Sequence, residues 1–268
     1  MNRSFFHKRV LPLILVLLTV SCQKVIVIPI NDEESKIVFE GVLKDRDSSS
    51  FFYLSRTVGI YEDESDIQPV SGAQITVFDS QGSQHVFAEH PQEPGTYVNY
   101  SFLAQENTTY NMTCVVGNEV ITSTSFTKTK PVIDSIYTKA NILDVEAPFS
   151  QWVYYHSSDP VDEVNNYRLR ITNNGKEPSQ YYIGNDYWIN GETYEAQFFG
   201  VDVFPGDTIH VEMLEFDPAV YNYLYGLSST LTTGAFSPAP SNPPSNLEGN
   251  AIGYFAVFMT DTASIIVQ

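Results

Sequence analysis

The chain has 268 residues, of which 43% are hydrophobic, 13% aromatic and 17% charged, and its formal net charge is −18. This composition is typical of a folded protein and excludes an acidic disordered chain. The 32 acidic residues against 14 basic ones exclude a nucleic-acid partner, because the protein surface and the phosphate backbone repel each other.

Residues 1–21 have the three parts of an export signal: a basic start, an apolar run over 10–20 and a small residue, Ser21. The apolar run is too short to span about 30 Å of hydrocarbon as a helix. A small residue directly before Cys22 is typical of bacterial lipoproteins, in which the cysteine becomes an acylated N-terminus. We expect 1–21 to be a signal peptide and Cys22 to carry the acyl chains of a membrane anchor. The alternative is an ordinary secretory signal that happens to contain a cysteine.

Cleavage at Cys22 changes the charge and leaves one other cysteine. It removes three basic residues and no acidic residue, which leaves 11 Lys and Arg against 32 Asp and Glu, a net charge of −21. Cys114 then has no partner, so we expect no disulfide. The alternating pattern of 110–116 predicts a strand in which Cys114 is a small buried hydrophobe rather than a reactive thiol.

The first half of the mature chain reads as a β-sandwich. Residues 22–35 form a short lipidated tether, and period-two apolar patterns separated by turn residues follow over 36–130. About seven short strands at this spacing predict an antiparallel, immunoglobulin-like sandwich. The candidate strands are 36–43, 50–58, 73–78, 84–89, 96–100, 110–116 and 119–127.

A break at 128–131 separates a second predicted β domain, 131–268. Its strand at 166–172 should turn Tyr167, Leu169 and Ile171 inward and project Arg168 and Arg170 from the other face. The other candidate strands are 133–137, 151–156, 180–183, 193–199, 208–216, 251–260 and 264–267.

One segment of the second domain has a helical pattern. Asp217 is a predicted N-cap, Pro218 suits the first helical position, and apolar residues recur near helical spacing through 218–231. The following segment, 237–246, holds four prolines and predicts an extended loop. The fold class is therefore all-β, with two sandwich-like domains and one short helix in the second.

With these elements placed, the chain resembles a Bacteroidota lipoprotein family that is described as a domain of unknown function. The resemblance covers the mature chain and depends on the order of short motifs. These motifs are residues 39–45, 54–56, 69–73, 95–97, 131–137, 206–209, 221–223, 243–246 and 251–255. Genes of that family often lie beside TonB-dependent receptors, so the resemblance implies an outer-membrane lipoprotein that works with such a transporter. Residues 70–77 are also similar to the carboxypeptidase-regulatory type of β-sandwich, a scaffold without peptidase chemistry.

No motif in the chain indicates catalysis, a metal or a cofactor. The histidines lack metal-ligand spacing, and no nucleophile elbow or phosphate-binding glycine loop occurs. The acidic run 62–66 lacks the calcium-loop register and reads as a solvated loop. We expect no enzyme activity. A hydrolase would need carboxylates or histidines gathered in a cleft.

Aromatic pairs are frequent in the second half, and Tyr187-Trp188 lies in a turn-rich stretch. Outward rings in loops can form a platform for sugars, peptides or an aromatic ligand, although most aromatic residues in strands simply fill a core. We therefore predict Tyr187 and Trp188 as ligand-binding residues. Ser135, Thr208 and Thr262 stand in short Asp-Ser/Thr-apolar motifs that resemble O-glycosylation acceptors of that phylum.

Two functions follow as expectations. The first is an accessory lipoprotein of the outer membrane, which binds a small ligand or docks to a TonB-dependent transporter during nutrient uptake. The second is a structural or adhesive envelope lipoprotein that has no small-molecule ligand.

Overall fold

The computed structural model describes residues 35–46, 50–59, 67–143, 147, 149–161, 163–178, 180–231 and 242–268. The predicted signal peptide, Cys22 and almost all of the tether lie outside these residues, as does the acidic run 62–66. No helix in the described ranges has the length and apolar character needed to cross a membrane.

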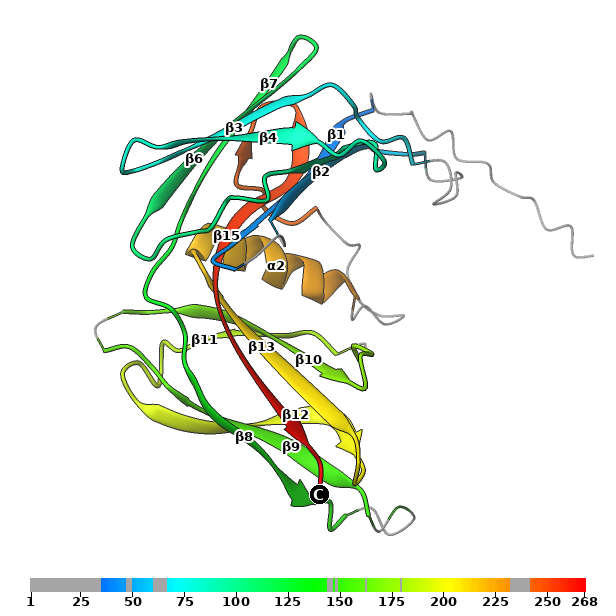
Figure 1. The fold of residues 1–268 in the computed structure, drawn as a ribbon, viewed down its shortest axis with the longest axis vertical. Coiled ribbons are helices and arrows are strands. Elements are labelled where there is room, and N and C mark those ends of the chain that lie inside the picture. Colours follow the sequence, from blue (N-terminus) through cyan, green and yellow to red (C-terminus); the bar gives the residue numbers. More distant parts are fainter. Residues whose placement is uncertain are drawn as a thin grey trace, which may run out of the picture. The chain divides into compact units, whose positions relative to one another are not determined.

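The described residues confirm an all-β fold with a single helix, α2 (Pro218–Leu231), drawn in Figure 1. The strands are β1 (Ile37–Lys44), β2 (Phe51–Arg56), β3 (Gln74–Asp79), β4 (Gln84–Glu89), β5 (Thr96–Val98), β6 (Thr109–Val116), β7 (Glu119–Phe126), β8 (Ile133–Ala140), β9 (Gln151–Ser158), β10 (Asn166–Asn173), β11 (Tyr182–Asn185), β12 (Thr193–Val203), β13 (Thr208–Phe216), β14 (Leu247–Glu248) and β15 (Ala251–Ile266). Each predicted strand therefore overlaps an observed one, the last two predicted strands both fall within β15, and β14 is an addition.

The first core lies inside a sandwich-like arrangement of the strands from the first half together with β14 and β15. Hydrogen bonds connect these strands in the order β15-β1-β2-β5-β4-β3-β6-β7-β14. Alternate residues of each strand point inward, among them Phe39, Phe52, Tyr97 and Cys114, which are all buried. Cys114 is thus the buried hydrophobe that the sequence predicts, and burial raises the pKa of its thiol to about 12.

The second core lies between two sheets of the second half. One is the three-stranded sheet β12-β9-β8, and the other is formed by β11, β10, β13 and the end of β15. Tyr167 and Ile171 of β10 are buried in this core and Leu169 packs against it, as the alternating pattern predicts. The two sheets thus bury their facing sides in a sandwich-like arrangement.

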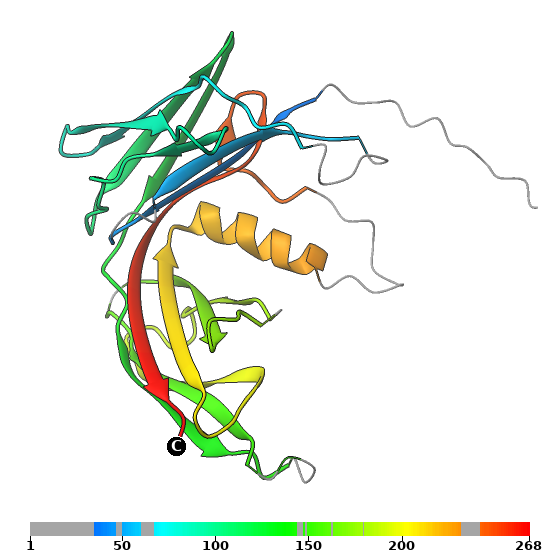
Figure 2. The same cartoon turned by 45° about the vertical axis from the view of Figure 1, so that its right-hand side comes forward.

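Strand β15 belongs to both arrangements. Its first half, 251–258, pairs in parallel with β1, and its second half, 259–266, pairs antiparallel with β13. Figure 2 shows β15 in red as one curved strand with α2 on its concave side. The prediction of two separate strands, 251–260 and 264–267, was wrong, because one uninterrupted strand crosses both sheets. The predicted boundary between residues 130 and 131 remains a prediction.

The pairing of β15 with β1 requires glycine at position 253. Gly253 has a φ of +123°, and a Cβ atom there would lie 1.9 Å from the carbonyl oxygen of Phe39. Only glycine adopts this backbone conformation without a steric penalty. Gly253 lies in one of the motifs that carry the family resemblance, so at this position the motif has a structural reason.

Helix α2 begins where the sequence predicts. The Asp217 carboxylate accepts hydrogen bonds from the backbone N–H groups of Ala219 (2.8 Å) and Val220 (3.1 Å), which are unsatisfied at a helix start. Val220 and Leu224 are buried against Phe216 and Phe258 of the sheet. The helix therefore covers part of the sheet face that points away from the two sandwich cores.

Candidate functional site

The candidate site lies on the sheet face that neither sandwich core uses. Along β1, Phe39 and Leu43 point into the first core, so Glu40, Val42 and Lys44 point to the opposite side. The same alternation along β15 turns Tyr254 and Phe258 outward. The charged side chains of Glu40 and Lys44 therefore lie on the same sheet face as the largely apolar Val42, Tyr254 and Phe258.

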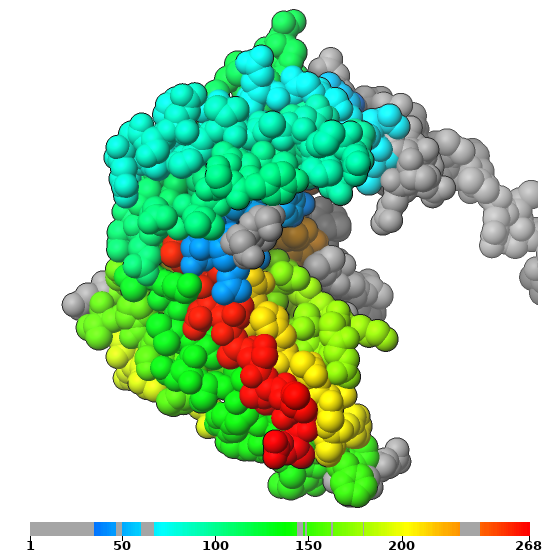
Figure 3. Space-filling model, in the orientation of Figure 1, coloured from blue at the N-terminus to red at the C-terminus, as the bar shows by residue number. Residues whose placement is uncertain are grey.

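Strands β10 and β13 extend this face from the second sandwich. Tyr167 and Ile171 enter the second core, and Arg168 and Arg170 project from the other side of β10, as predicted. Leu214 of β13 lies beside them. Because β15 pairs with both β1 and β13, the outward faces of the two sandwiches meet. Figure 3 shows β1 in blue, β15 in red and β13 in yellow side by side at the centre of the molecule.

A groove of about 440 Å³ lies where these faces meet, which we call the basic groove. Its lining residues come from β1, β2, β10, β13 and β15. They are Glu40, Val42, Lys44, Phe51, Arg168, Arg170, Leu214, Tyr254 and Phe258. Three of the 14 lysines and arginines of a strongly acidic chain thus line one groove.

Two of these cations are held by carboxylates. Lys44 Nζ donates a 2.8 Å hydrogen bond to Glu212 Oε1, and Arg170 Nη1 donates one of 3.0 Å to Glu212 Oε2. Arg170 also makes a bidentate contact with Glu177, at 3.1 Å and 2.8 Å. Burial acts to raise the pKa of Glu212, but Lys44 and then Arg170 outweigh it and keep that pKa below its usual range. The Glu212 carboxylate is therefore ionised and holds both cations in position.

The third cation, Arg168, has spare donors. Its ion pair with Glu177, at 3.9 Å, is beyond hydrogen-bond distance. Its guanidinium stacks on the Tyr181 ring, 4.3 Å from the ring centroid. The Tyr181 hydroxyl is buried and has no hydrogen-bond partner among the described residues. Arg168 is thus oriented by an aromatic ring while its N–H groups remain available to a ligand.

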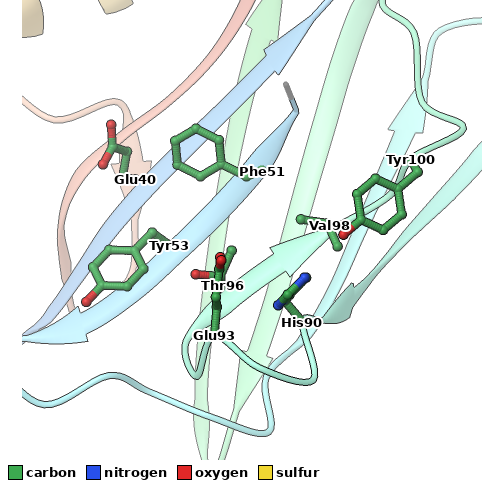
Figure 4. A pocket seen from close by; sticks show the side chains of 8 residues that line it. All are labelled: Glu40, Phe51, Tyr53, His90, Glu93, Thr96, Val98 and Tyr100. Carbon is green, nitrogen blue, oxygen red and sulfur yellow. The ribbon is translucent and has the colours of Figure 1, made fainter. Parts of the chain in front are cut away.

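A second groove of about 420 Å³, which we call the acidic groove, adjoins the first. It shares Glu40 and Phe51 with the basic groove, and Figure 4 shows its lining side chains. The remaining lining residues are Tyr53, His90, Glu93, Thr96, Val98 and Tyr100. None of the residues that line the acidic groove is a lysine or an arginine, whereas three line the basic groove, and Glu40 lines both. Glu40 stands between the two grooves, where it accepts a 3.0 Å hydrogen bond from the Tyr254 hydroxyl.

The predicted binding residues Tyr187 and Trp188 lie elsewhere. They follow β11 in a turn, where their side chains are 62% and 90% exposed and their rings meet edge to face at 4.9 Å. Neither residue lines the basic or the acidic groove. Their binding role remains a prediction, and it belongs to a different surface from the grooves.

A buried carboxyl pair fixes the turn that carries Trp188. Asp186 Oδ1 and Oδ2 both accept from the backbone N–H of Asn165, and Asp159 accepts from the Tyr167 hydroxyl at 2.7 Å and from the Gly191 N–H at 2.8 Å. Burial raises the pKa of Asp186 above its usual range, and Asp159 adds to the rise. The two carboxyl groups thus hold both ends of the turn.

The three predicted glycosylation residues differ in exposure. Ser135 and Thr208 are exposed in their strands, and Thr262 is half-buried beside Arg46, whose guanidinium donates to its hydroxyl at 3.3 Å. Their glycosylation remains a prediction. Within the described ranges, no three His, Cys, Asp or Glu side chains gather in a way that could hold a metal ion.

Sequence reasoning did not assemble the grooves, although a signal for them was present. Arg168 and Arg170 were predicted to share the outward face of a strand, but their partners come from distant segments around residues 40–51, 177–181 and 212–214. The register of β15 brings these segments together. The useful signal is the alternation of charged residues along strands in a chain with few cations.

The fold and site define an all-β protein with sandwich-like sheets, one helix and a charged groove on the outward face of the large sheet. Residues 23–264 match the family model described as "Domain of unknown function (DUF4249)", so the chain belongs to this family. No curated protein matches the chain. A solved structure with partial likeness is a two fibronectin type-III domain segment from chicken tenascin, at 13% identity, covering 68% of this chain and 91% of that one with a TM-score of 0.23. A likeness this weak carries no argument about function.

Proposed function

We propose that this protein is a binding protein of the bacterial cell envelope that takes a small ligand in the basic groove. The observation that carries the proposal is the gathering of Lys44, Arg168 and Arg170 in one concave site of a chain whose net charge is −18. Exposed cations without a function would be expected to scatter over an acidic surface. Here two are fixed by one buried carboxylate, that of Glu212, and the third has donors to spare.

The groove has the features of a ligand site rather than of a structural contact. It is concave, its walls are largely apolar, and a few polar groups converge on it, as in small-molecule sites generally. A ligand with an anionic group would complete the hydrogen bonding of Arg168, and its apolar part would contact Phe51 and Phe258. We propose binding and not catalysis as the role of this site.

The location and the partner belong to the same proposal. The export signal and Cys22 support a lipid-anchored protein of the outer membrane, and the resemblance supports a TonB-dependent transporter as the partner that receives the ligand. Affinity purification of the intact lipoprotein from solubilised membranes should then recover a large β-barrel protein. Repeated recovery of the lipoprotein alone would count against the partnership.

Native mass spectrometry of the protein purified gently from its own envelope tests the binding role. We expect a bound small molecule on the wild-type protein and its loss from a variant that carries both Arg168→Ala and Arg170→Ala. The control is Arg56→Ala, an exposed arginine outside both grooves. The absence of any bound molecule, together with normal nutrient uptake after deletion of the gene, would favour the second candidate, a structural or adhesive envelope protein.

A further inference from the structure

The two adjoining grooves differ in charge along one continuous path. The basic groove is lined by Lys44, Arg168 and Arg170, the acidic groove is lined by Glu93 without a lysine or arginine, and Glu40 lies where the two grooves meet. Because both grooves are lined by Glu40 and Phe51, a single ligand can pass from one to the other. Such a ligand would carry a negative charge at one end and a positive charge at the other.

The walls between the charged ends suit apolar side chains. Phe51 and Phe258 line the basic groove, while Tyr53, Val98 and Tyr100 line the acidic groove, and Tyr100 is 64% exposed. Aromatic rings of this kind contact hydrophobic side chains and also attract a cation to their faces. The Tyr53 and Tyr100 rings therefore favour a protonated amine at the acidic end, beside Glu40 and Glu93.

The basic end suits a terminal carboxylate. Arg168 lacks a hydrogen-bonded partner in the described part of the chain, and its planar guanidinium can bind both oxygens of a carboxylate at once. The Tyr181 hydroxyl, also without a partner among the described residues, belongs to the ring on which Arg168 stacks. Lys44 and Arg170 add positive charge but already bind Glu212.

The sheet order limits the length of the ligand. From β10 to β5 the order is β10-β13-β15-β1-β2-β5, and neighbouring strands lie about 4.8 Å apart. The path across these strands is therefore at most about 24 Å, since the sheet curves. An extended peptide advances about 3.3–3.6 Å per residue, so a chain of up to about seven residues would fill it.

We infer that the two grooves together bind a short linear peptide with free ends. Its carboxylate lies at Arg168, its amine lies at Glu40 and Glu93, and its apolar side chains contact the aromatic walls. The inference rests on the proposed function and names the chemical class of the ligand. A nucleic acid does not fit, because the acidic groove would repel it.

The test is an affinity selection in solution, with the full mature chain and a randomised heptapeptide library read out by mass spectrometry. We expect the wild-type protein to enrich peptides with free ends. When the C-terminal ends of the library peptides are amidated, the enrichment should fall by at least about tenfold. The Arg168→Ala variant should lose a similar factor and should no longer distinguish free from amidated ends. Glu40→Gln should weaken the preference for a free amine over an acetylated one.

Control variants and the peptide chemistry keep the test decisive. Arg56→Ala should behave as the wild type, and Arg168→Lys should keep the charge but lose the two-point contact with a carboxylate. If Arg168→Ala fails to fold, the comparison of free and amidated libraries on the wild-type protein decides alone. Equal enrichment of free and capped peptides, or no enrichment at all, would overturn the inference. If the library shows no preference for free ends but native mass spectrometry finds a bound molecule that depends on Arg168 and Arg170, the peptide inference fails while the proposed function stands.

Discussion

The Ser125 hydroxyl of β7 donates a 2.5 Å hydrogen bond to Asp217, the carboxylate that caps helix α2. Ser125 in turn accepts a hydrogen bond from the backbone N–H of Val257 in β15, at 3.2 Å. One buried contact therefore joins the first sandwich, the shared strand and the helix. Since the helix covers part of the face on which the basic groove lies, this contact helps to hold the site.

Replacement of Asp217 should destabilise the whole arrangement. We expect Asp217→Ala to lower the free energy of unfolding by about 2–3 kcal/mol, because it removes a helix cap and leaves a buried hydroxyl without its acceptor. Ser125→Ala should cost less, about 1 kcal/mol, since the cap remains. Chemical denaturation measures both, with Glu192→Ala, an exposed carboxylate, as the control. Equal stability of wild type and Asp217→Ala would contradict the role of this contact.

Helix α2 also shows how far the sequence predicts the fold. Asp217-Pro218 is a local signal, because a cap and a first-turn proline act within one turn, and the helix begins there. Strands 84–89 and 208–216 were predicted with their observed bounds for a similar reason, since alternation is a local property. These elements could be predicted without knowing which strands they pack against or pair with.

The pairing of strands that are distant in the sequence could not be predicted from the sequence. Residues 261–263 were read as a break, but Asp261 stays in the strand and its carboxylate accepts a 2.8 Å hydrogen bond from the Ile133 N–H. The groove depends on the same pairing, because Lys44 meets Glu212 only when β15 lies between β1 and β13. A pattern in one segment cannot indicate the register of another segment 168 residues away.

Glu215 should make stability depend on pH. Burial raises the pKa of this carboxyl from 4.5 to about 8, with Asp217 and Glu163 adding to the rise, and one of its oxygens has no hydrogen-bond partner within the described ranges. Because the folded state binds the proton more tightly, the stabilisation is fully present below about pH 4.5 and is lost as the pH rises to about 8.

The variant Glu215→Gln tests this dependence, because its side chain stays neutral at every pH. We expect its free energy of unfolding to fall by several kcal/mol less than that of the wild type between about pH 4.5 and 8, at about 1.4 kcal/mol for each tenfold change in the ionisation constant. Denaturant titrations at several pH values give the comparison, with Glu192→Gln as the control. Parallel pH profiles of wild type and Glu215→Gln would show that folding does not raise the pKa of this carboxyl.

Removal of the Glu212 side chain should destabilise the folded protein at the basic groove. Glu212→Ala leaves Lys44, whose side chain is 11% exposed, without its partner, so we expect a loss of about 3 kcal/mol. Folding lowers the pKa of Glu212, whereas it raises the pKa of Glu215, so the two groups change the stability in opposite directions with pH. Its stabilisation is present above the ordinary carboxyl pKa of 4.5 and is lost as the pH falls through the lower pKa of the folded state. Acid titrations of wild type and variant should therefore differ least at low pH.

Tyr187 and Trp188 should matter for a partner and not for the fold. Because Trp188 is 90% exposed, the variant that carries Tyr187→Ala and Trp188→Ala should keep its free energy of unfolding within about 0.5 kcal/mol. Exposed Trp and Tyr often dominate binding interfaces, so we expect less transporter to copurify with this variant. Unchanged recovery of the transporter would leave these two rings without a role in docking.

A crystal structure of the protein purified together with its native ligand tests the central claim most directly. We predict electron density for the ligand in the basic groove, with an anionic group within hydrogen-bond distance of the Arg168 guanidinium. Ligand density at Tyr187 and Trp188, with only solvent beside Arg168, would contradict the account.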